Sequence, residues 1–449
     1  MEQNDEARPT PVAATPQQAG ESRDPWWWVE RAVWTERMLS RLTTREPANR
    51  VWFRLVDKTY APANLASAFQ KVWVNGGSAG ADAQTVAHFG RQAEAELARL
   101  HEQLRNGTYR PQPVRRAWIP KPGSTEKRPL GIPAVRDRVV QAALRQVLEP
   151  IFETEFAESS YGFRPGRGAK DALRRVDTLL KAGHDWVVDA DLRSYFDTIP
   201  HARLMALVQA RVADGRVLAL VESFLRAGVL EESKGWQPTE RGTPQGGVIS
   251  PLLANLYLDP FDHQMERAGR ELVRYADDFV ILCRSEAEAQ AALEEVRAWV
   301  ETAGLTLHPT KTRILNANAP GGFDFLGYHF ERGMKWPRQK SLMKLKERVR
   351  LKTSRLDGRN LEIIVADVNR TLRGWYGYFQ HSKATTFGYV DGYVRRRLRS
   401  VLQWRLDGQG KGKGAAHHRW PNQWFARCGL LSLAAEHQWT RTIVRLRTH

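Results

Sequence analysis

Two adjacent acidic residues, Asp277 and Asp278, stand between two apolar stretches that predict a pair of β-strands. Residues 272–275 and 279–283 are mainly β-branched or aromatic, as is typical of a half-buried sheet. We therefore predict a hairpin whose tip holds both carboxylates at a sheet edge, facing a cleft. Anions gathered there repel each other and lose hydration unless a cation joins them, and hard oxygen ligands suit magnesium. The alternative for this motif alone is a solvated turn.

A third acid, Asp191, ends another apolar stretch that predicts a strand. Nucleotidyl transfer by two metal ions requires carboxylates that converge on cations roughly 3.5–4 Å apart. We expect Asp191, Asp277 and Asp278 to supply them, with the backbone carbonyl of Leu192 as a further oxygen ligand. Asp189 is a weaker candidate, because it shares a face of the strand with Asp191 but lies one pleat away.

A glycine-rich segment, residues 241–255, lies between these acids and contains Gly242, Gly246 and Gly247. Glycine lets the backbone approach a ligand closely. We interpret the segment as a loop that leads into a helix facing a nucleotide. An ordinary loop-to-helix junction is the alternative.

In this order, these motifs resemble a known family: the reverse transcriptase and maturase proteins encoded by bacterial group II introns. The resemblance extends from about residue 37 to the C-terminus. Its other motifs are at residues 118–122 (WIPKP), 127–133 (KRPLGIP), 160–167 (SYGFRPGR), 304–305 (GL), 311–312 (KT), 325–328 (FLGY), 372–375 (LRGW) and 420–422 (WPN). Some of these motifs are weak alone, but together they are highly specific.

The resemblance implies an α+β fold, a right-hand polymerase whose fingers and palm contain antiparallel sheet, followed by an α-helical thumb and maturase domain. We expect a disordered tail at residues 1–25, an N-terminal helical extension at 26–100, reverse transcriptase fingers and palm at 101–332, and the thumb with the maturase-specific domain at 333–449. The tryptophans at 26–28 should open a helical stretch by packing, with RNA stacking as the alternative. Residues 83–106 should form one helix before the fingers.

The resemblance also implies roles at the nucleotide site, carried over by position. Lys121 and Arg128 look like contacts to the incoming triphosphate, which fits the preference of phosphates for lysine and arginine; a solvated basic loop is the alternative. Gln245 and Gly246 resemble the segment that lines the template and nucleotide. Lys311 is expected to belong to the same site.

Phe196, five residues after Asp191, falls where such enzymes place a bulky ring under the sugar. A phenyl ring cannot hydrogen-bond a 2′-hydroxyl and would occupy its space, so deoxynucleotides should be favoured and DNA should be the product. The alternative is that Phe196 is an ordinary core residue.

The charge of the chain is concentrated in its C-terminal quarter. Residues 331–449 contain 26 Lys and Arg against 8 Asp and Glu, a surplus equal to the net charge of +18 of the whole chain. This cationic field should attract phosphate backbones, whereas a charge run alone is usually a solvated face. We expect a basic helix at residues 341–356 and an amphipathic helix at residues 361–372. The residues expected to bind RNA are Arg373, Trp375, Arg395, Arg396 and Arg397, although packing in a helix bundle is equally expected for Trp375.

The expected partners are group II intron RNA, an RNA template with a DNA primer, target DNA and deoxynucleoside triphosphates. No apolar run reaches the roughly 18 residues of a membrane span and no secretory signal is present, so we expect no membrane partner and a cytoplasmic location. The C-x-x-C pairs of a zinc endonuclease are absent, so we expect the endonuclease-lacking type and no nicking of the second strand.

Three functions are compatible with the sequence. The first is an intron-encoded enzyme that copies RNA into DNA and helps its intron to splice. The second is a reverse transcriptase recruited by the host for defence or repair. The third, a non-catalytic RNA-binding splicing factor, is disfavoured, because clustered anions would repel RNA phosphates.

Overall fold

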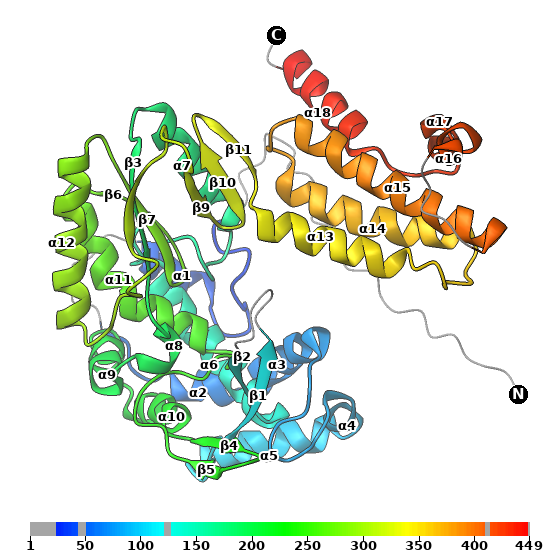
Figure 1. Cartoon of the computed structure of the whole chain (residues 1–449). Helices are drawn as coiled ribbons and strands as arrows, with labels where there is room; N and C mark the ends of the chain where they lie inside the picture. The colour runs from blue at the N-terminus through cyan, green and yellow to red at the C-terminus, as the bar shows by residue number, and fades with distance from the viewer. Residues whose placement is uncertain (1–23, 44–50, 121–126, 409–413, 448–449) are drawn as a thin grey trace, which may run out of the picture.

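The computed structural model describes residues 24–43, 51–120, 127–408 and 414–447, so the predicted tail lies almost wholly outside it. Figure 1 shows sheets wrapped by helices in the first three quarters of the chain, and a bundle of helices, α13 to α18, after them. The α+β, right-hand architecture expected from the sequence is confirmed. Within the described residues no helix combines the length and apolar character needed to cross a bilayer.

The palm is a four-stranded sheet in the order β6-β7-β3-β8, in which all neighbours are antiparallel. Its strands are β3 (Trp186–Asp191), β6 (Glu271–Tyr275), β7 (Asp278–Cys283) and β8 (Arg313–Asn316). Because side chains alternate along a strand, the two faces of β7 join different cores. Phe279, Ile281 and Cys283 pack in the core with helices α11 (Ser250–Arg267) and α12 (Glu286–Thr302). Val280 and Leu282 pack with α7 (Ala169–Lys181) on the opposite face.

Helix α12 packs against β3 and β7 of this sheet. The Ser285 hydroxyl accepts a hydrogen bond from the backbone N–H of Glu288 at 3.2 Å and so caps the helix. Gly304, at φ +66°, follows its C-terminus. The palm also contains the helices α8 (Tyr195–Thr198), α9 (His201–Gln209) and α10 (Gly215–Leu225). Cys283 is buried and Cys428 is half-buried, and both are free thiols.

The fingers contain a second sheet in the order β2-β1-β4-β5. Its strands are β1 (Val114–Pro120), β2 (Lys127–Ile132), β4 (Val229–Glu231) and β5 (Gly235–Gln237). Helix α6 (Val135–Glu153) is buried along most of its length and connects the fingers to the palm core. It packs against α2 (Val56–Tyr60) and α3 (Pro62–Asn75) of the N-terminal extension.

Two expectations for the extension are wrong in detail. Residues 83–106 form two helices, α4 (Val86–Arg91) and α5 (Ala93–Arg105), because the backbone leaves helical geometry at Gln92. The residues at 26–28 form turns, and the first helix, α1 (Glu36–Thr43), begins later. Trp26 and Trp28 pack against the core as expected, whereas Trp27 is 50% exposed.

A small antiparallel sheet leads from the palm into the helical bundle. It consists of β9 (Phe323–Phe325), β10 (Tyr328–Glu331) and β11 (Met334–Pro337). The bundle helices are α13 (Gln339–Lys352), α14 (Leu361–Phe379), α15 (Thr385–Asp407), α16 (Ala415–Arg419), α17 (Asn422–Arg427) and α18 (Leu433–Arg447). The predicted apolar stripe of α14 is confirmed as core, and the helix continues seven residues beyond the predicted end at Leu372.

Candidate active site

The turn between β6 and β7 carries the two adjacent acids. Tyr275 and Asp278 are the last paired residues of the hairpin, so Ala276 and Asp277 alone form its loop. Ala276 has φ +60°, a left-handed conformation that costs a non-glycine residue about 1–2 kcal/mol. The surrounding structure must therefore hold this turn in place.

Asp191 lies directly opposite Asp278 in the pairing of β3 with β7. Side chains of directly opposed residues project from the same face of a sheet, with Cβ atoms roughly 5 Å apart. Asp189 lies on that face one pleat further along β3. The structure thus brings Asp191 beside the hairpin tip that carries Asp277 and Asp278, as the sequence predicts.

Burial and mutual repulsion make it unfavourable for these carboxyl groups to carry their negative charges together. Burial, followed by the charges of Asp189, Asp277 and Asp191, raises the pKa of Asp278 to about 7. Burial also raises the pKa of Asp277, an effect that the Asp191 charge increases and the Arg128 charge opposes. A divalent cation would relieve this repulsion, and carboxylate oxygens are the ligands it prefers. The donor set therefore fits such an ion.

Two cations from the β8 region approach these acids. Lys311 forms an ion pair with the carboxylate of Asp191, and Arg313 donates from Nε to Asp189 at 3.3 Å. The Lys311 ammonium therefore occupies one oxygen of the Asp191 carboxylate. Among the described residues, no three Asp, Glu, His or Cys side chains lie close enough together to hold a metal ion.

The backbone after Asp191 is fixed by hydrogen bonds that leave one carbonyl oxygen available. The His308 N–H donates to the Asp191 carbonyl at 2.7 Å, and the Arg193 N–H donates to the Thr306 carbonyl at 2.8 Å. Leu192, paired with Leu307 between these two bonds, directs its own N–H and C=O to the other side. This geometry is compatible with the Leu192 carbonyl as the further oxygen ligand.

A buried polar network holds the acidic turn from behind, and the sequence reasoning missed it. Arg274 is fully buried, forms an ion pair with buried Asp262, and donates to the carbonyl of Ala276 at 2.8 Å. It also donates to Asn255 at 3.1 Å and to the Ser160 hydroxyl at 2.8 Å. An arginine within an apolar strand and an aspartate within an apolar helix were the available signals, because buried charges require partners.

The turn is also covered by the loop at residues 160–167. A Cβ on Gly162 would lie 2.3 Å from the Ala276 nitrogen, so only glycine permits this close contact. Asn255 donates to the Gly162 carbonyl at 2.7 Å, which ties the loop to the same polar network.

The glycine-rich segment packs against the fingers and leads into α11. Gly246 has φ +114°, and a Cβ there would lie 2.3 Å from the Gly131 carbonyl oxygen of β2. The Gly131 N–H in turn donates to the Gln245 carbonyl at 2.7 Å. The Val248 N–H donates to the Gln141 side chain of α6 at 2.7 Å, so this loop connects fingers and palm.

Phe196 lies in α8, immediately after β3, and is half-buried. Its ring packs edge-on against Tyr195 and Phe163, with ring centroids 5.5 and 6.4 Å apart. It also lines a cavity of about 320 Å³ together with Trp118 of the fingers and Arg241 of the glycine-rich segment. This position is compatible with a ring beside a bound nucleotide.

The two basic residues assigned to the triphosphate differ in what the structure shows. Lys121 lies outside the described residues. Arg128 is exposed on β2, where it pairs with Ile119, and its charge reaches Asp277.

The residues assigned to RNA binding also differ in their surroundings. Arg373 and Arg396 are exposed, and Arg395 lies 3.9 Å from the carboxylate of Asp391. The Arg397 guanidinium is occupied at the end of α13, where it donates to the backbone and side chain of Thr353.

Trp375 is half-buried in the bundle, with its ring centroid 4.9 Å from that of Phe379. Its indole N–H has no hydrogen-bond partner among the described residues. This geometry agrees with the packing alternative for Trp375.

Comparison with known proteins agrees with this arrangement. A model of the family "Reverse transcriptase (RNA-dependent DNA polymerase)" matches residues 119–330, and one of "Group II intron, maturase-specific domain" matches residues 342–420. Protein YkfC of Escherichia coli (strain K12) is 34% identical over 338 residues, which cover 66% of this chain and 87% of YkfC. Group II intron-encoded protein LtrA of Lactococcus lactis subsp. cremoris is 38% identical over 234 residues, which cover 51% of this chain and 38% of LtrA. Among solved structures, a chain of a partial Cas6-RT-Cas1–Cas2 complex is 27% identical and covers 55% of this chain and 41% of that chain, but its TM-score of 0.36 is too low to bear on the fold.

The fold and the opposed carboxylates define a polymerase of the right-hand class. The chain belongs to the group II intron reverse transcriptases: it is an RNA-directed DNA polymerase with a maturase-specific domain. Enzymes of this family use divalent metal ions, and both matched domains imply RNA as a partner.

Proposed function

We propose that the chain copies its group II intron RNA into DNA with two Mg²⁺ ions, and promotes the splicing of that RNA. The position of Asp191 opposite Asp278, beside the tip that carries Asp277, is the observation that supports this most directly. These three carboxylates and the Leu192 carbonyl are the proposed ligands. When bound, the ions would stabilise the attacking and leaving oxygens of the transfer.

The protein's own groups would bind and orient the incoming deoxynucleoside triphosphate. Lys121 and Arg128 would neutralise phosphate oxygens, for which cationic side chains are suited. Gln245 and Gly246 would line the template and the base, and the Phe196 ring would exclude a 2′-hydroxyl. Lys311, released from Asp191, would be available to an anionic group of the nucleotide.

The basic C-terminal part would hold the intron RNA and the primer–template duplex. Its exposed cations Arg373 and Arg396 are the best placed for phosphates, and Arg395 is the next. Arg397 and Trp375 would act by holding the bundle together, because their contacts lie within it. The domain limits at residues 25, 100 and 332 stay predictions.

The use of target DNA, the expected lack of second-strand nicking and a cytoplasmic location also stay predictions. Recruitment by the host for defence or repair is the second candidate function. The maturase-specific domain favours an intron-encoded protein over it. Location of the reading frame within a folded intron RNA would decide between them.

Primer extension on an RNA template, run beside a splicing assay with the intron RNA that surrounds the reading frame, tests the proposal. Asp277→Ala should abolish extension and leave splicing intact. Asp57→Asn, on an exposed position of α2, is the control and should retain both activities. Full extension by Asp277→Ala would contradict the assignment of the ligands, and failure of the wild type to extend would contradict the function.

A further inference from the structure

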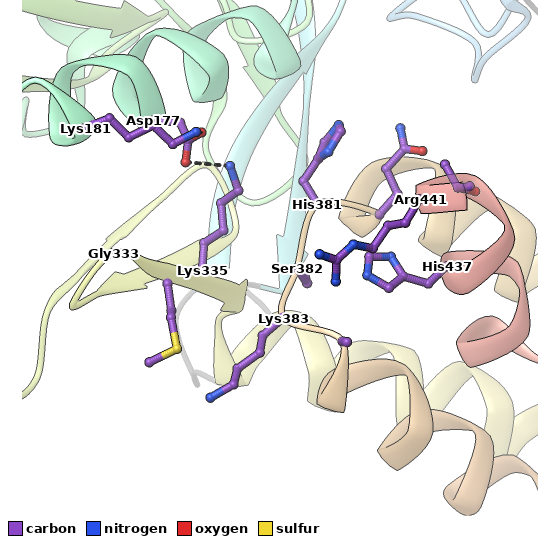
Figure 2. Close-up of a pocket in the computed structure, with 13 residues that line it drawn as sticks. Asp177, Lys181, Gly333, Lys335, His381, Ser382, Lys383, His437 and Arg441 are labelled. Atoms are coloured by element: carbon purple, nitrogen blue, oxygen red, sulfur yellow. Dashed lines mark hydrogen bonds and ion pairs between the residues drawn. The ribbon is translucent and has the colours of Figure 1, made fainter. Parts of the chain in front are cut away.

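A cavity of about 780 Å³ lies where the palm meets the helical bundle, outside the candidate active site. Its walls come from α7, from β11, from the turn between α14 and α15, and from α18. Figure 2 shows Lys335 of β11 beside Asp177. Arg441 of α18 and Lys383 lie on the bundle side, and the Lys383 side chain extends away from Lys335 and Arg441. Both matched domains therefore contribute to one cavity.

The lining of this cavity is strongly cationic. It contains Lys181, Lys335, Lys383 and Arg441 against one acid, Asp177. Asp177 is fully occupied, because it accepts from both Lys181 and Lys335 at 2.7 Å. Lys383 and Arg441 form no ion pair with any described residue, so their charges stay available to a ligand.

A second, adjoining cavity of about 210 Å³ extends the same cationic surface. It shares Asp177, Lys335 and His381 with the first cavity and adds Lys170 and Arg174. The pKa of His381 is lowered by partial burial and then by the charges of Lys335, Lys170 and Arg174. The positive potential thus spans both cavities.

The cavity also has a preformed wall and a buried polar group. The Lys383 N–H donates to the Lys335 carbonyl at 2.8 Å, so the α14–α15 turn is tied to β11. Ser382, in that turn, is 4% exposed and lines the cavity. Its hydroxyl lies beside that of Tyr328 but makes no hydrogen bond of ordinary geometry with a described residue.

We infer that this cavity binds backbone phosphates of a folded RNA, at a site separate from the polymerase centre. Cations at this density favour phosphate oxygens. Apart from the rings of His381 and His437, the larger cavity has no aromatic side chain in its lining, so it offers little surface on which a nucleobase would stack. The inference rests on the proposed function, because it takes RNA as the partner. Occupation of the cavity would hold palm and bundle in one relative position on the RNA.

Charge reversal tests this inference on the full chain. Both Lys383→Glu and Arg441→Glu alter exposed side chains, so the double variant should fold, and its thermal denaturation is the check. The probe is a labelled RNA hairpin, with affinity measured over a series of salt concentrations. We expect roughly tenfold weaker binding, and a slope of log affinity against log salt that is smaller by about one for each phosphate that the variant no longer neutralises.

The matched control is Arg226→Glu with Arg297→Glu, which makes the same change in net charge on α10 and α12. Both control arginines are more than half exposed, and each forms its ion pair among the described residues with one glutamate, Glu222 of α10 or Glu294 of α12. The control should keep the wild-type slope. The control double variant should extend a primer at the wild-type rate, because neither of its residues belongs to the polymerase site or to the basic C-terminal part.

Lysine acylation of the wild-type protein, with and without the RNA hairpin, is a second test that requires no variant. The hairpin should protect Lys383, Lys335 and Lys181, and should leave Lys71, exposed on α3, reactive. An unchanged slope in the cavity variant, with a wild type that binds RNA and extends primers, would overturn this inference alone. A wild type that does neither would overturn the proposed function. Protection of the same lysines by inorganic tripolyphosphate but not by the hairpin would identify a small polyphosphate as the ligand and overturn the assignment to RNA.

Discussion

Arg274 and Asp262 form a fully buried ion pair directly behind the turn that carries Asp277. The same guanidinium donates to the carbonyl of Ala276, the strained residue of that turn. The pair therefore connects the stability of the palm to the position of a proposed metal ligand.

Removal of one partner should destabilise the protein strongly. Asp262→Asn leaves the buried Arg274 charge uncompensated, which costs about 3–5 kcal/mol. Glu294→Gln, which removes an exposed pair with Arg297, should cost about 1 kcal/mol or less. Urea denaturation of the two variants measures both values, and equal costs would contradict the role given to the buried pair.

Phe196→Ala should relax the selection of the sugar. With the ring removed, a 2′-hydroxyl has room beside α8, and discrimination against ribonucleotides should fall by roughly tenfold or more. The ratio of kcat/KM for a deoxynucleotide and its ribonucleotide measures this. Tyr195→Phe is the matched control: it removes only the hydroxyl that donates to the Ala254 carbonyl at 2.6 Å, so the ratio should not change. An unchanged ratio in Phe196→Ala would refute the assignment.

Gly246→Ala should impair both folding and primer extension. The new Cβ would lie 2.3 Å from the Gly131 carbonyl oxygen, so the glycine-rich loop would have to move away from β2. Gly269→Ala is the control, because Gly269 has φ +69° but open space around its Cβ position. It should cost about 1–2 kcal/mol through backbone strain alone and leave the rate of extension unchanged. Equal rates for the two variants would show that the contact between loop and fingers does not matter.

Asp137 should make stability depend on pH. Burial raises its pKa to about 6, although Tyr109 donates to it at 2.6 Å and the Gln112 N–H at 2.9 Å. Because the folded state holds the proton more tightly than the unfolded state does, the contribution of this group is full below about pH 4 and is lost as the pH rises through 6. A shift of about two pKa units corresponds to a loss of about 3 kcal/mol.

The difference in free energy of unfolding between wild type and Asp137→Asn isolates this effect. The asparagine does not titrate, so the wild type should lose stability relative to the variant between pH 4 and pH 7. Parallel pH profiles for the two proteins would mean that Asp137 keeps an ordinary pKa in the folded chain.

The features that sequence predicts best here are those with a local physical signature. The apolar stripe of α14 depends on residues three or four positions apart, and it is confirmed. The meeting of Asp191 with Asp278 depends on a strand pairing that joins distant segments, and it was predicted only because the chemistry requires convergent acids.

What sequence did not predict are interactions whose partners lie far apart in the chain. The pairing of Lys311 with Asp191 was missed, since a lysine in a loop carries no mark of its partner. Arg397 is expected to bind RNA because of its neighbours in a basic run, and this stays a prediction, but its Nε and Nη2 donate to Thr353. A one-dimensional pattern of charge cannot separate an exposed arginine from one that caps a neighbouring helix.

The pairing of β3 with β7 as neighbouring strands has a consequence for how the chain tolerates length changes. Insertion of a single residue within β3 would slip its register and turn Asp191 to the opposite side of the sheet, since alternate residues point to opposite faces. Spacing inside this strand is therefore as constrained as the identity of its acids. Insertions and deletions should be accepted only in the connections outside the palm strands.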